Sequence, residues 1–419
     1  MTRLINFLVD KKKTIKKIFF TLFIIFVYVI GTRIYIPFLK KDYYLAFDPM
    51  LIKQFESLFS SNSSLCILSL GVMPYVTASI VIQLSQKVFP FMKEWQEQGE
   101  KGKRKINILT RILTILLSLG HGWTFIQMSF GHGLTFSLMK PLLSDFMFQT
   151  LFFLTVGVFI SVWLADLITS KGLGNGISIL IAVGMVDKLY KTFEYLLFAN
   201  GSETKRILIL ISYFILLILT IILSSAYLKI PINYAINRNN YKIDKHIPIK
   251  LNTSGILPII FADAFFNLIR QISLFFPKNG TNRTIDIFLS SRSDLGIYFF
   301  VYILLIMLFS FLSSFMTINP KDVAEHLSKQ NAYLKDVQPG LPTVKKIVRE
   351  MFKITFLGSC FLTLLASAPD IINYLAGSAI SKQITFGGTS LLIIVGVALE
   401  SIQDMKAKNN VQRIYNKFF

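Results

Sequence analysis

Long apolar runs recur along the chain, separated by shorter polar segments. A helix needs about 20 mostly apolar residues to span the hydrocarbon core of a bilayer. Six runs meet this length with few polar interruptions: Ile18–Ile36, Ile106–Met128, Phe146–Ile168, Ile207–Leu228, Leu295–Ile318 and Phe352–Leu375. Four more segments are long enough but more polar: Leu70–Val88, Ile177–Leu197, Gly255–Phe276 and Ile384–Ile402. The pattern predicts ten spanning helices, with both ends of the chain on the same side of the membrane.

The four polar segments are the second, fifth, seventh and tenth in chain order. The second carries Pro74 and Gln83, and the seventh carries Asp263, Asn267 and Arg270. Such side chains gain nothing from contact with lipid, but they are tolerated where they face protein or line a water-filled cavity. These segments are therefore candidates to surround an aqueous path. Helix–helix packing through small and hydroxyl-bearing residues is the alternative.

The composition fits a membrane protein and excludes other broad classes. The chain of 419 residues is 53% hydrophobic and 16% charged, whereas soluble domains carry about 25% charged residues. Its 13 Pro and 23 Gly follow no repeat, which argues against a fibrous or low-complexity chain. Its 2 Cys and 4 His lack the spacing of a disulfide framework or a metal site, so we expect no metal and no cofactor.

The net charge of +21 is distributed unevenly along the chain. With the N-terminus inside, 30 of the 44 basic residues fall in inner segments and 14 in outer ones. Because inner loops of membrane proteins are enriched in Lys and Arg, this split predicts that both termini lie inside. Two inner loops, 229–250 and 319–350, are long as well as basic, and Lys321–Gln330 has the pattern of a short amphipathic helix. The basic residues are either topology signals or a docking surface for a large acidic partner, such as a ribosome or a cytosolic motor.

Six blocks of sequence are specific when they are taken together. They are LGVMPYVTASIVIQL at Leu70–Leu84, EQGEKGKRKINILTR at Glu97–Arg111, TSKGLGNGISIL at Thr169–Leu180, KLNTSGILPIIF at Lys250–Phe261, NPKDVAEHL at Asn319–Leu327 and FGGTSLLIIV at Phe386–Val395. In this order and spacing, over the whole chain, they resemble the SecY family, the channel subunits of bacterial-type protein translocases. The resemblance implies an all-α membrane protein with ten transmembrane helices in two five-helix halves, a plug and a lateral gate.

The resemblance also implies the domain boundaries. A basic cytosolic N-terminus at 1–17 precedes the N-terminal half at 18–200, which holds spans 1–5 and a plug at 53–63. The C-terminal half at 201–405 holds spans 6–10 and the two long cytosolic loops. A cytosolic tail follows at 406–419.

In the family, a ring of apolar side chains closes the waist of an hourglass-shaped pore. Carried over motif by motif, the ring consists of Val76, Ile80, Ile177, Ile181, Ile260 and Ile393. The pairs in the second and fifth spans are four residues apart, so both members of a pair lie on one helix face. Stiff β-branched side chains can dewet a constriction against ions and still yield to a passing chain. The plug would include Lys53, Phe55, Leu58 and Phe59.

The resemblance implies two further groups of site residues. The lateral gate, between the second and third spans and the seventh and eighth, would include Thr77, Gln83, Asp263 and Asn267. Cytosolic docking would involve Lys229, Arg238, Gln338, Lys345, Lys346 and Arg349. Gln338 stands where the family usually has an Arg before Pro-Gly, a position associated with the SecA motor. Asp263 replaces a small polar residue that is common in the seventh span.

The glycines at 172, 174 and 176 superficially suggest a nucleotide-binding loop. No strand pattern precedes them, and the chain contains no GxxxxGK[ST] sequence. We therefore expect no ATPase site, no catalytic residues and no enzymatic activity. A partner or a gradient must then supply the energy for transport.

The resemblance implies a protein-conducting channel that translocates unfolded preproteins across a membrane and releases membrane-protein helices into it. The expected partners are SecE-like and SecG-like small membrane subunits, a ribosome, a SecA motor or both, preproteins and the lipid bilayer, but not DNA. The expected location is the inner membrane of a bacterium or of a bacterium-derived organelle, such as a protist mitochondrion or a plastid thylakoid. A secondary transporter of a small solute and a nonfunctional scaffold are the alternatives. A transporter needs coupling charges at mid-membrane, where Asp263 is the one deeply placed carboxylate candidate.

Overall fold

The computed structural model describes residues 2–36, 66–130, 140–198, 203–234, 246–253, 255, 257–275, 297–330, 332–334, 337–376, 390 and 392–405. Most of these residues are helical, and three short strands form a small sheet. The chain forms two compact units. The first unit comprises Met1–Lys191, Asn267–Pro277 and Glu400–Phe419, and the second comprises Thr192–Phe266 and Lys278–Leu399.

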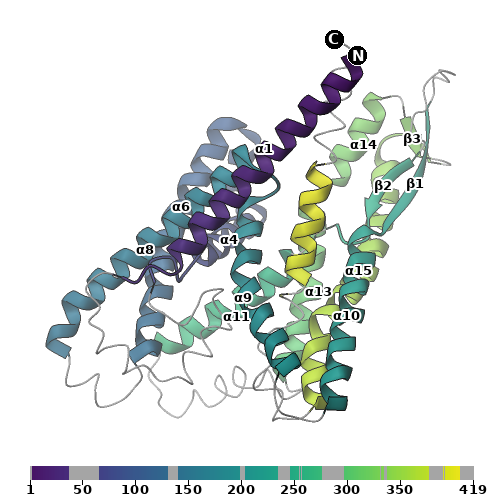
Figure 1. Cartoon of the computed structure of the whole chain (residues 1–419). Helices are drawn as coiled ribbons and strands as arrows, with labels where there is room; N and C mark the ends of the chain where they lie inside the picture. Colours follow the sequence, from purple (N-terminus) through teal and green to yellow (C-terminus); the bar gives the residue numbers. More distant parts are fainter. Residues whose placement is uncertain are drawn as a thin grey trace. The chain divides into compact units, whose positions relative to one another are not determined.

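The first unit is mainly helical (Figure 1). Its elements are α1 (Thr2–Gly31), α4 (Met73–Val88), α5 (Pro90–Glu97), α6 (Glu100–Phe130), α8 (Lys140–Lys171) and most of α9 (Gly176–Phe198). α4 packs along α6, α6 along α8, and α8 along α1. Pro74 lies in the first turn of α4, where its missing N–H removes no helical hydrogen bond. Pro90 occupies the same position in α5 and so separates the two helices.

The core of the first unit lies where α6 and α8 meet the turn before α4. Leu70, Phe125, Leu154 and Val158 are buried there. Within this stretch of α8, a Cβ atom added at Gly157 would collide with the backbone carbonyl of the turn at residue 67. Glycine therefore allows α8 to approach the turn that leads into α4.

Buried hydroxyl groups in the first unit bond to carbonyl groups of their own helices. Thr110 donates to the carbonyl of Ile106 at 2.9 Å, and Thr114 donates to the carbonyl of Thr110 at 2.7 Å. In α8, Ser161 donates to the carbonyl of Gly157 at 2.9 Å. Because lipid offers no hydrogen-bond partner, this back-bonding satisfies these three hydroxyl groups inside a membrane.

The second unit combines helices with a small sheet (Figure 1). Its elements are α10 (Glu203–Ser225), β1 (Tyr227–Tyr234), β2 (His246–Lys250), most of α11 (Leu257–Phe275), α13 (Ile297–Thr317), α14 (Pro320–Lys329), β3 (Ala332–Leu334) and α15 (Leu341–Ala376). Residues 392–405 form a further helix. α13 packs along α15, where the hydroxyl groups of Ser314 and Thr355 are 2.8 Å apart. The rings of Phe261 in α11 and Phe309 in α13 meet edge to face, with centroids 5.7 Å apart.

The sheet is antiparallel and has the strand order β2–β1–β3. Leu251 donates its backbone N–H to the carbonyl of Ala226 at 2.9 Å, one pair beyond the ladder of β1 and β2. Because hydrogen-bonded and non-bonded pairs alternate in an antiparallel ladder, Pro231 and Pro248 then fall in non-bonded pairs. Neither proline therefore removes a hydrogen bond between β1 and β2.

The sheet, α14 and the first turns of α15 share one apolar core, and we call this assembly the sheet module. Ile230 and Ile232 alternate along β1, so they lie on the same face of the sheet. They belong to one buried cluster with Leu327 of α14 and with Ile347 and Met351 of α15. Figure 1 shows the three strands and α14 together at one end of α15.

A helix is present at each of the ten segments that the hydropathy pattern identified. Among the described residues, four helical stretches are long and apolar enough to cross a membrane: Glu100–Ile126, Met147–Lys171, Phe299–Lys329 and Leu341–Ala368. The number of crossings and the division into two five-helix halves stay predictions. The amphipathic helix expected at Lys321–Gln330 is confirmed as α14, and the side chain of Asn319 caps it by accepting the backbone N–H of Lys321 at 3.2 Å.

The fold is mostly helical rather than all-α, because parts of the two long loops pair as the sheet. The sequence contains a signal for this pairing, since Ile-Pro-Ile occurs in both β1 and β2, and Ile230 and Ile232 of β1 and Ile249 of β2 are buried. The strands are short, and residues far apart in the chain supply the surface that covers them. The apolar pattern of one loop alone therefore does not predict the sheet.

The first prediction concerns Ile347, which is 1% exposed in the core of the sheet module. Ile347→Ala should lower the free energy of unfolding of the module by about 2–4 kcal/mol, because the lost methyl groups leave a cavity. The control is Lys345→Ala, on the exposed side of the same helix, with an expected change under about 0.5 kcal/mol. Denaturant titration in detergent measures both changes, and equal destabilisation by the two variants would contradict the packing.

Candidate functional site

Two of the six expected ring positions lie on α4. Val76 and Ile80 are 8% and 6% exposed, and their spacing of four residues places them on one face of the helix. α4 packs most extensively along α6. The helix that carries the first ring pair is thus enclosed in the first unit rather than spread on its surface.

The second expected ring pair lies in the first turns of α9. Ile181 is 2% exposed and Ile177 is half-buried. Asn175 precedes the helix and accepts the backbone N–H of Ile177 at 3.1 Å through its side-chain oxygen. This local bond fixes where α9 begins and therefore where the pair sits along the helix.

The last two ring positions belong to the second unit. Ile260 is half-buried in the first turn of α11, and Ile393 is 2% exposed near the start of the helix at 392–405. The structure thus assigns four of the six positions to the first unit and two to the second. The convergence of all six side chains at one waist stays a prediction.

The expected gate residues are polar groups within helices. Thr77 is buried and donates to the carbonyl of Met73 at 3.1 Å, and the Gln83 side chain donates to the hydroxyl of Ser79 at 3.1 Å. Both bonds stay inside α4, so the polarity of this helix is satisfied without a partner helix. In α11, Asp263 is half-buried, and Asn267 follows four residues later in the same helix, with its side chain outside the described part.

The expected plug, with Lys53, Phe55, Leu58 and Phe59, lies outside the described residues. The chain on either side of it is described. Tyr35 and Cys66 form an antiparallel bridge, and the backbone N–H of Ile67 donates to the carbonyl of Ile34 at 3.0 Å. The two ends of the segment that contains the expected plug are therefore joined to each other.

The glycine-rich turn between α8 and α9 is held by side chains of two helices. The hydroxyl of Thr21 in α1 accepts the backbone N–H of Leu173 at 3.1 Å. The hydroxyl of Thr169 in α8 accepts the backbone N–H of Gly176 at 2.9 Å. The turn therefore fastens α1, α8 and α9 together.

Each glycine of this turn has a packing reason. A Cβ atom at Gly172 would lie 2.5 Å from the hydroxyl of Thr21, and one at Gly174 would lie 2.7 Å from the hydroxyl of Ser401. A Cβ atom at Gly176 would collide with the backbone carbonyl of Ala165. Close packing therefore accounts for all three glycines.

The expected docking residues gather on the sheet module, apart from Arg238, which lies outside the described residues. Lys229 is exposed on β1, and its ammonium lies 5.5 Å from the ring centroid of Tyr227. Gln338 is exposed before α15, and its backbone carbonyl accepts the hydroxyl of Thr343 at 2.8 Å. In the first turns of α15, Lys345 and Arg349 are exposed and Lys346 is half-buried.

The sheet module shows how the expected docking residues are arranged, which the sequence did not reveal. Lys229 belongs to one long loop and Lys345 to the other, more than a hundred residues later. β1 carries the first, α15 carries the second, and both elements share one buried cluster. The two loops therefore present their basic side chains from a single folded body.

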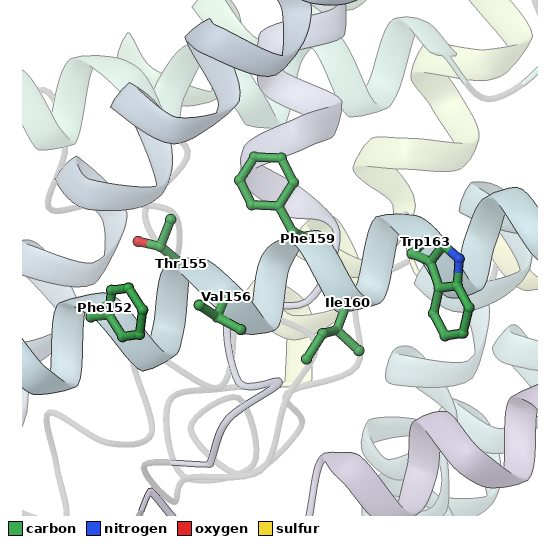
Figure 2. Close-up of a pocket in the computed structure, with 6 residues that line it drawn as sticks. All are labelled: Phe152, Thr155, Val156, Phe159, Ile160 and Trp163. Carbon is green, nitrogen blue, oxygen red and sulfur yellow. The ribbon is translucent and has the colours of Figure 1, made fainter.

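One apolar groove of about 460 Å³ lies along α8 and opens to its surroundings. Its lining comes from one face of the helix, as Figure 2 shows: Phe152, Thr155, Val156, Phe159, Ile160 and Trp163. The only polar side-chain group among them that is not an indole, the hydroxyl of Thr155, donates to the carbonyl of Leu151 at 2.8 Å. The groove offers an apolar surface of the kind that faces acyl chains or another helix, and it has no catalytic groups.

Three features define the class of protein. Several helices are long and apolar enough to cross a membrane, their hydroxyl groups bond within the helices, and a sheet module carries basic side chains. Together they define a multi-pass helical membrane protein with a folded module that carries basic side chains.

Comparison with known proteins narrows this class. The family model for SecY matches residues 66–402. The protein translocase subunit SecY of Staphylococcus epidermidis is 35% identical over 417 residues, which cover 95% of either chain. This chain belongs to the SecY family.

Solved structures share the fold. One described as a protein conducting channel has a TM-score of 0.66 at 18% identity, covering 94% of this chain and 92% of that one. Sec61 in the canine ribosome–channel complex from the endoplasmic reticulum has a TM-score of 0.62 at 18% identity, with the same coverage. The family is one of translocase channel subunits, so the chain is not an enzyme, and none of these relatives supports a small-solute transporter.

The second prediction concerns Gly176. Gly176→Ala should destabilise the protein by about 2–3 kcal/mol, because its Cβ meets a backbone carbonyl that cannot rotate away. Gly99→Ala is the control: Gly99 has a φ of +67° but open space around its Cβ, so only the backbone cost of about 1 kcal/mol applies. Thermal unfolding in detergent compares the two variants. A Gly176→Ala variant as stable as Gly99→Ala would show that the turn is not packed as described.

Proposed function

We propose that this chain is the pore-forming subunit of a protein-conducting channel. It moves unfolded preproteins across the membrane and releases membrane-protein helices into it. The observation that carries the proposal is the SecY match over residues 66–402, which includes the glycine turn, the sheet module and the helices with the expected ring residues.

The closed state would depend on the apolar ring. In this proposal, Val76, Ile80, Ile177 and Ile181 meet Ile260 and Ile393 at the waist of the pore. β-Branched side chains have few rotamers, so the constriction keeps its shape, and a narrow apolar constriction excludes ions by dewetting. The burial of Val76, Ile80, Ile181 and Ile393 supports the assignment, because lipid-facing residues would be exposed.

The plug and the lateral gate complete the proposal. A plug at 53–63 would move as a loop on a fixed base, and the bridge between Tyr35 and Cys66 supports this idea because it holds the ends of that loop together. The gate would include Asp263 of α11 and the polar residues of α4. Back-bonding of Thr77 and Gln83 within α4 is consistent with such a gate, because no hydrogen bond of these two side chains has to break when α4 moves.

Docking of the translation machinery is the proposed role of the sheet module. Lys229, Lys345, Lys346 and Arg349 would bind phosphate groups of ribosomal RNA. The fold is shared with a channel described in a ribosome–channel complex, and this likeness supports the choice of partner. Gln338 lacks the charge of the Arg that is usual in the family, so we propose that a ribosome drives transport here rather than a SecA motor.

The proposed partner subunits, orientation and membrane are those of the SecY family. We propose that SecE-like and SecG-like small membrane subunits bind the channel and that both termini lie inside. The membrane would be the inner membrane of a bacterium or of a bacterium-derived organelle. The identity of 35% to a bacterial translocase subunit supports a bacterial-type membrane.

The third prediction tests the proposed path of the preprotein. In a background with Cys66→Ser and Cys360→Ser, the variants Ile80→Cys and Ile181→Cys should form disulfide bonds with an arrested preprotein that carries a single cysteine. Phe152→Cys, at a position on the outer face of α8 that is 59% exposed, is the control and should not react. Gel analysis of the crosslinks measures this. Reaction at position 152 but at neither ring position would place the preprotein outside the proposed pore.

The fourth prediction tests docking. Reversing Lys345, Lys346 and Arg349 to Glu should weaken ribosome binding, and the loss should be greatest at low salt, because phosphate contacts release counterions. Reversing the exposed residues Lys101, Lys103 and Arg104 to Glu makes the same change of charge in the first unit and should have a smaller effect. Cosedimentation at two salt concentrations compares the variants. Equal ribosome binding by the wild type and the first variant at low salt would leave these residues as topology signals only.

A further inference from the structure

The turn between α8 and α9 is fixed on both sides of Gly174. Before it, the backbone N–H of Leu173 is bound by Thr21 of α1, and after it, the backbone N–H of Gly176 is bound by Thr169 of α8. Gly174 itself has a φ of +70°, a left-handed conformation that glycine adopts without steric cost. The backbone at Gly174 is therefore a fixed surface rather than a free loop tip.

The helix at 392–405, yellow in Figure 1, meets this surface at Ser401. A Cβ atom at Gly174 would lie 2.7 Å from the hydroxyl oxygen of Ser401 and 3.4 Å from its Cβ atom. The side chain of Ser401 is half-buried. A serine extends only one heavy atom beyond its Cβ atom, so serine and glycine together let the helix and the turn come into close contact. A larger side chain at position 401 would hold them apart.

Ser401 lies on the same side of its helix as a proposed ring residue. Ile393, Val397 and Ser401 follow one another at intervals of four residues, and residues at this spacing share a helix face. Ile393 is 2% exposed and Val397 is 6% exposed. At 1.5 Å per residue, Ser401 is about 12 Å along the helix from Ile393. Helices bend only gently over such a length, so a shift of Ser401 also moves Ile393.

The chain passes from one compact unit to the other between these two residues. Ile393 belongs to the second unit, which extends to Leu399, and Ser401 belongs to the first unit, which resumes at Glu400. The helix is continuous across this boundary. The contact of Ser401 with Gly174 thus attaches to the first unit a helix that carries a ring residue of the second.

We propose that Ser401 is a positioning residue of the pore ring and that its contact with Gly174 is a fixed joint, which stays closed throughout transport. The inference rests on the proposed channel function, because it takes Ile393 as a member of the ring. When the second unit moves, the helix turns about the joint, and the displacement grows with distance from it. Ile393 leaves the waist as a preprotein enters and returns to the same place afterwards. Hinges at the ends of elements commonly absorb such movements.

A larger side chain at position 401 tests the positioning role in the full-length channel. Ser401→Leu adds volume against the fixed backbone of Gly174, so the end of the helix must shift and Ile393 with it. Ala398→Leu is the matched control, because it adds a larger side chain at an exposed position one turn earlier. In a planar bilayer without ribosome or preprotein, Ser401→Leu should raise the resting ion conductance roughly fivefold or more, since a misaligned apolar ring admits water. Ala398→Leu should stay at the wild-type level.

A second conductance separates positioning from a merely structural effect. After a preprotein is released from the pore, the conductance of Ser401→Leu should equal that of the wild type, because the joint affects only the closed ring. Equal resting conductance of Ser401→Leu and Ala398→Leu would overturn the positioning role and leave the proposed channel intact. Absence of any conductance from the wild type after release would instead contradict the proposed function itself.

A disulfide bond tests the fixed joint without enlarging a side chain. In a background with Cys66→Ser and Cys360→Ser, the pair Gly174→Cys and Ser401→Cys should oxidise readily. The expected Cβ–Cβ distance of 3.4 Å is close to the range of roughly 3.5–4.5 Å found in disulfides.

The same variant reports whether the joint stays closed during transport. The oxidised channel should transport a preprotein at a rate within roughly twofold of the same channel after reduction with dithiothreitol, because a hinge contact does not have to open. The comparison of one variant in two redox states removes the backbone cost of the cysteine at position 174. Failure of the disulfide to form would show that the turn and the helix are not in contact. Transport that is blocked until reduction would show that the contact must open, and either result overturns the proposal.

Discussion

Inside a bilayer no water satisfies a polar group, and the structure depends on how its helices meet that constraint. The described hydroxyl groups of α4, α6 and α8 donate mainly to carbonyl groups one turn earlier in the same helix. The contact between Ser314 and Thr355 is a described exception that joins two helices. A helix whose polar groups are satisfied internally can contact protein, lipid or a passing polypeptide in turn. The proposed lateral gate would need this freedom.

Helices are also fixed where a glycine lets one backbone approach another closely. Gly157 of α8 lies against the turn before α4, and Gly176 lies against the last part of α8. Gly358 of α15 approaches the carbonyl of Leu251, just after β2, in the same way. Such contacts hold two elements close together. A larger residue in place of the glycine would meet backbone atoms, which cannot move aside as a side chain can.

The sequence predicted the helices well because a long apolar run has one stable form in a membrane. A helix is present at every expected segment, and α14 was predicted from the charge pattern between two prolines. The sheet was missed because Ile230 and Ile232 are covered by Leu327 and Ile347, which lie about a hundred residues later. The apolar pattern of neighbouring residues does not reveal a contact between residues so far apart in the sequence. The expected docking residues were named singly from the sequence, but their arrangement on one folded module depends on the same distant pairing.

The ring and gate residues show a different limit of prediction from the sequence. Spacing alone predicts that Val76 and Ile80 share a helix face, and the structure agrees that both are buried. Their proposed role in a pore ring rests on the family motif, because an isoleucine in a membrane helix is equally suited to packing against protein or to facing lipid.

The central claim is that this chain forms a pore wide enough for a polypeptide, and the current through single channels tests it most directly. The purified channel is reconstituted into a planar bilayer with a ribosome and an arrested preprotein, and the preprotein is then released with puromycin. Our account predicts little conductance while the preprotein fills the pore and a large, ion-permeable conductance immediately after its release. No conductance in either state, together with saturable exchange of a small solute by the same protein reconstituted into vesicles, would contradict the channel and favour a transporter.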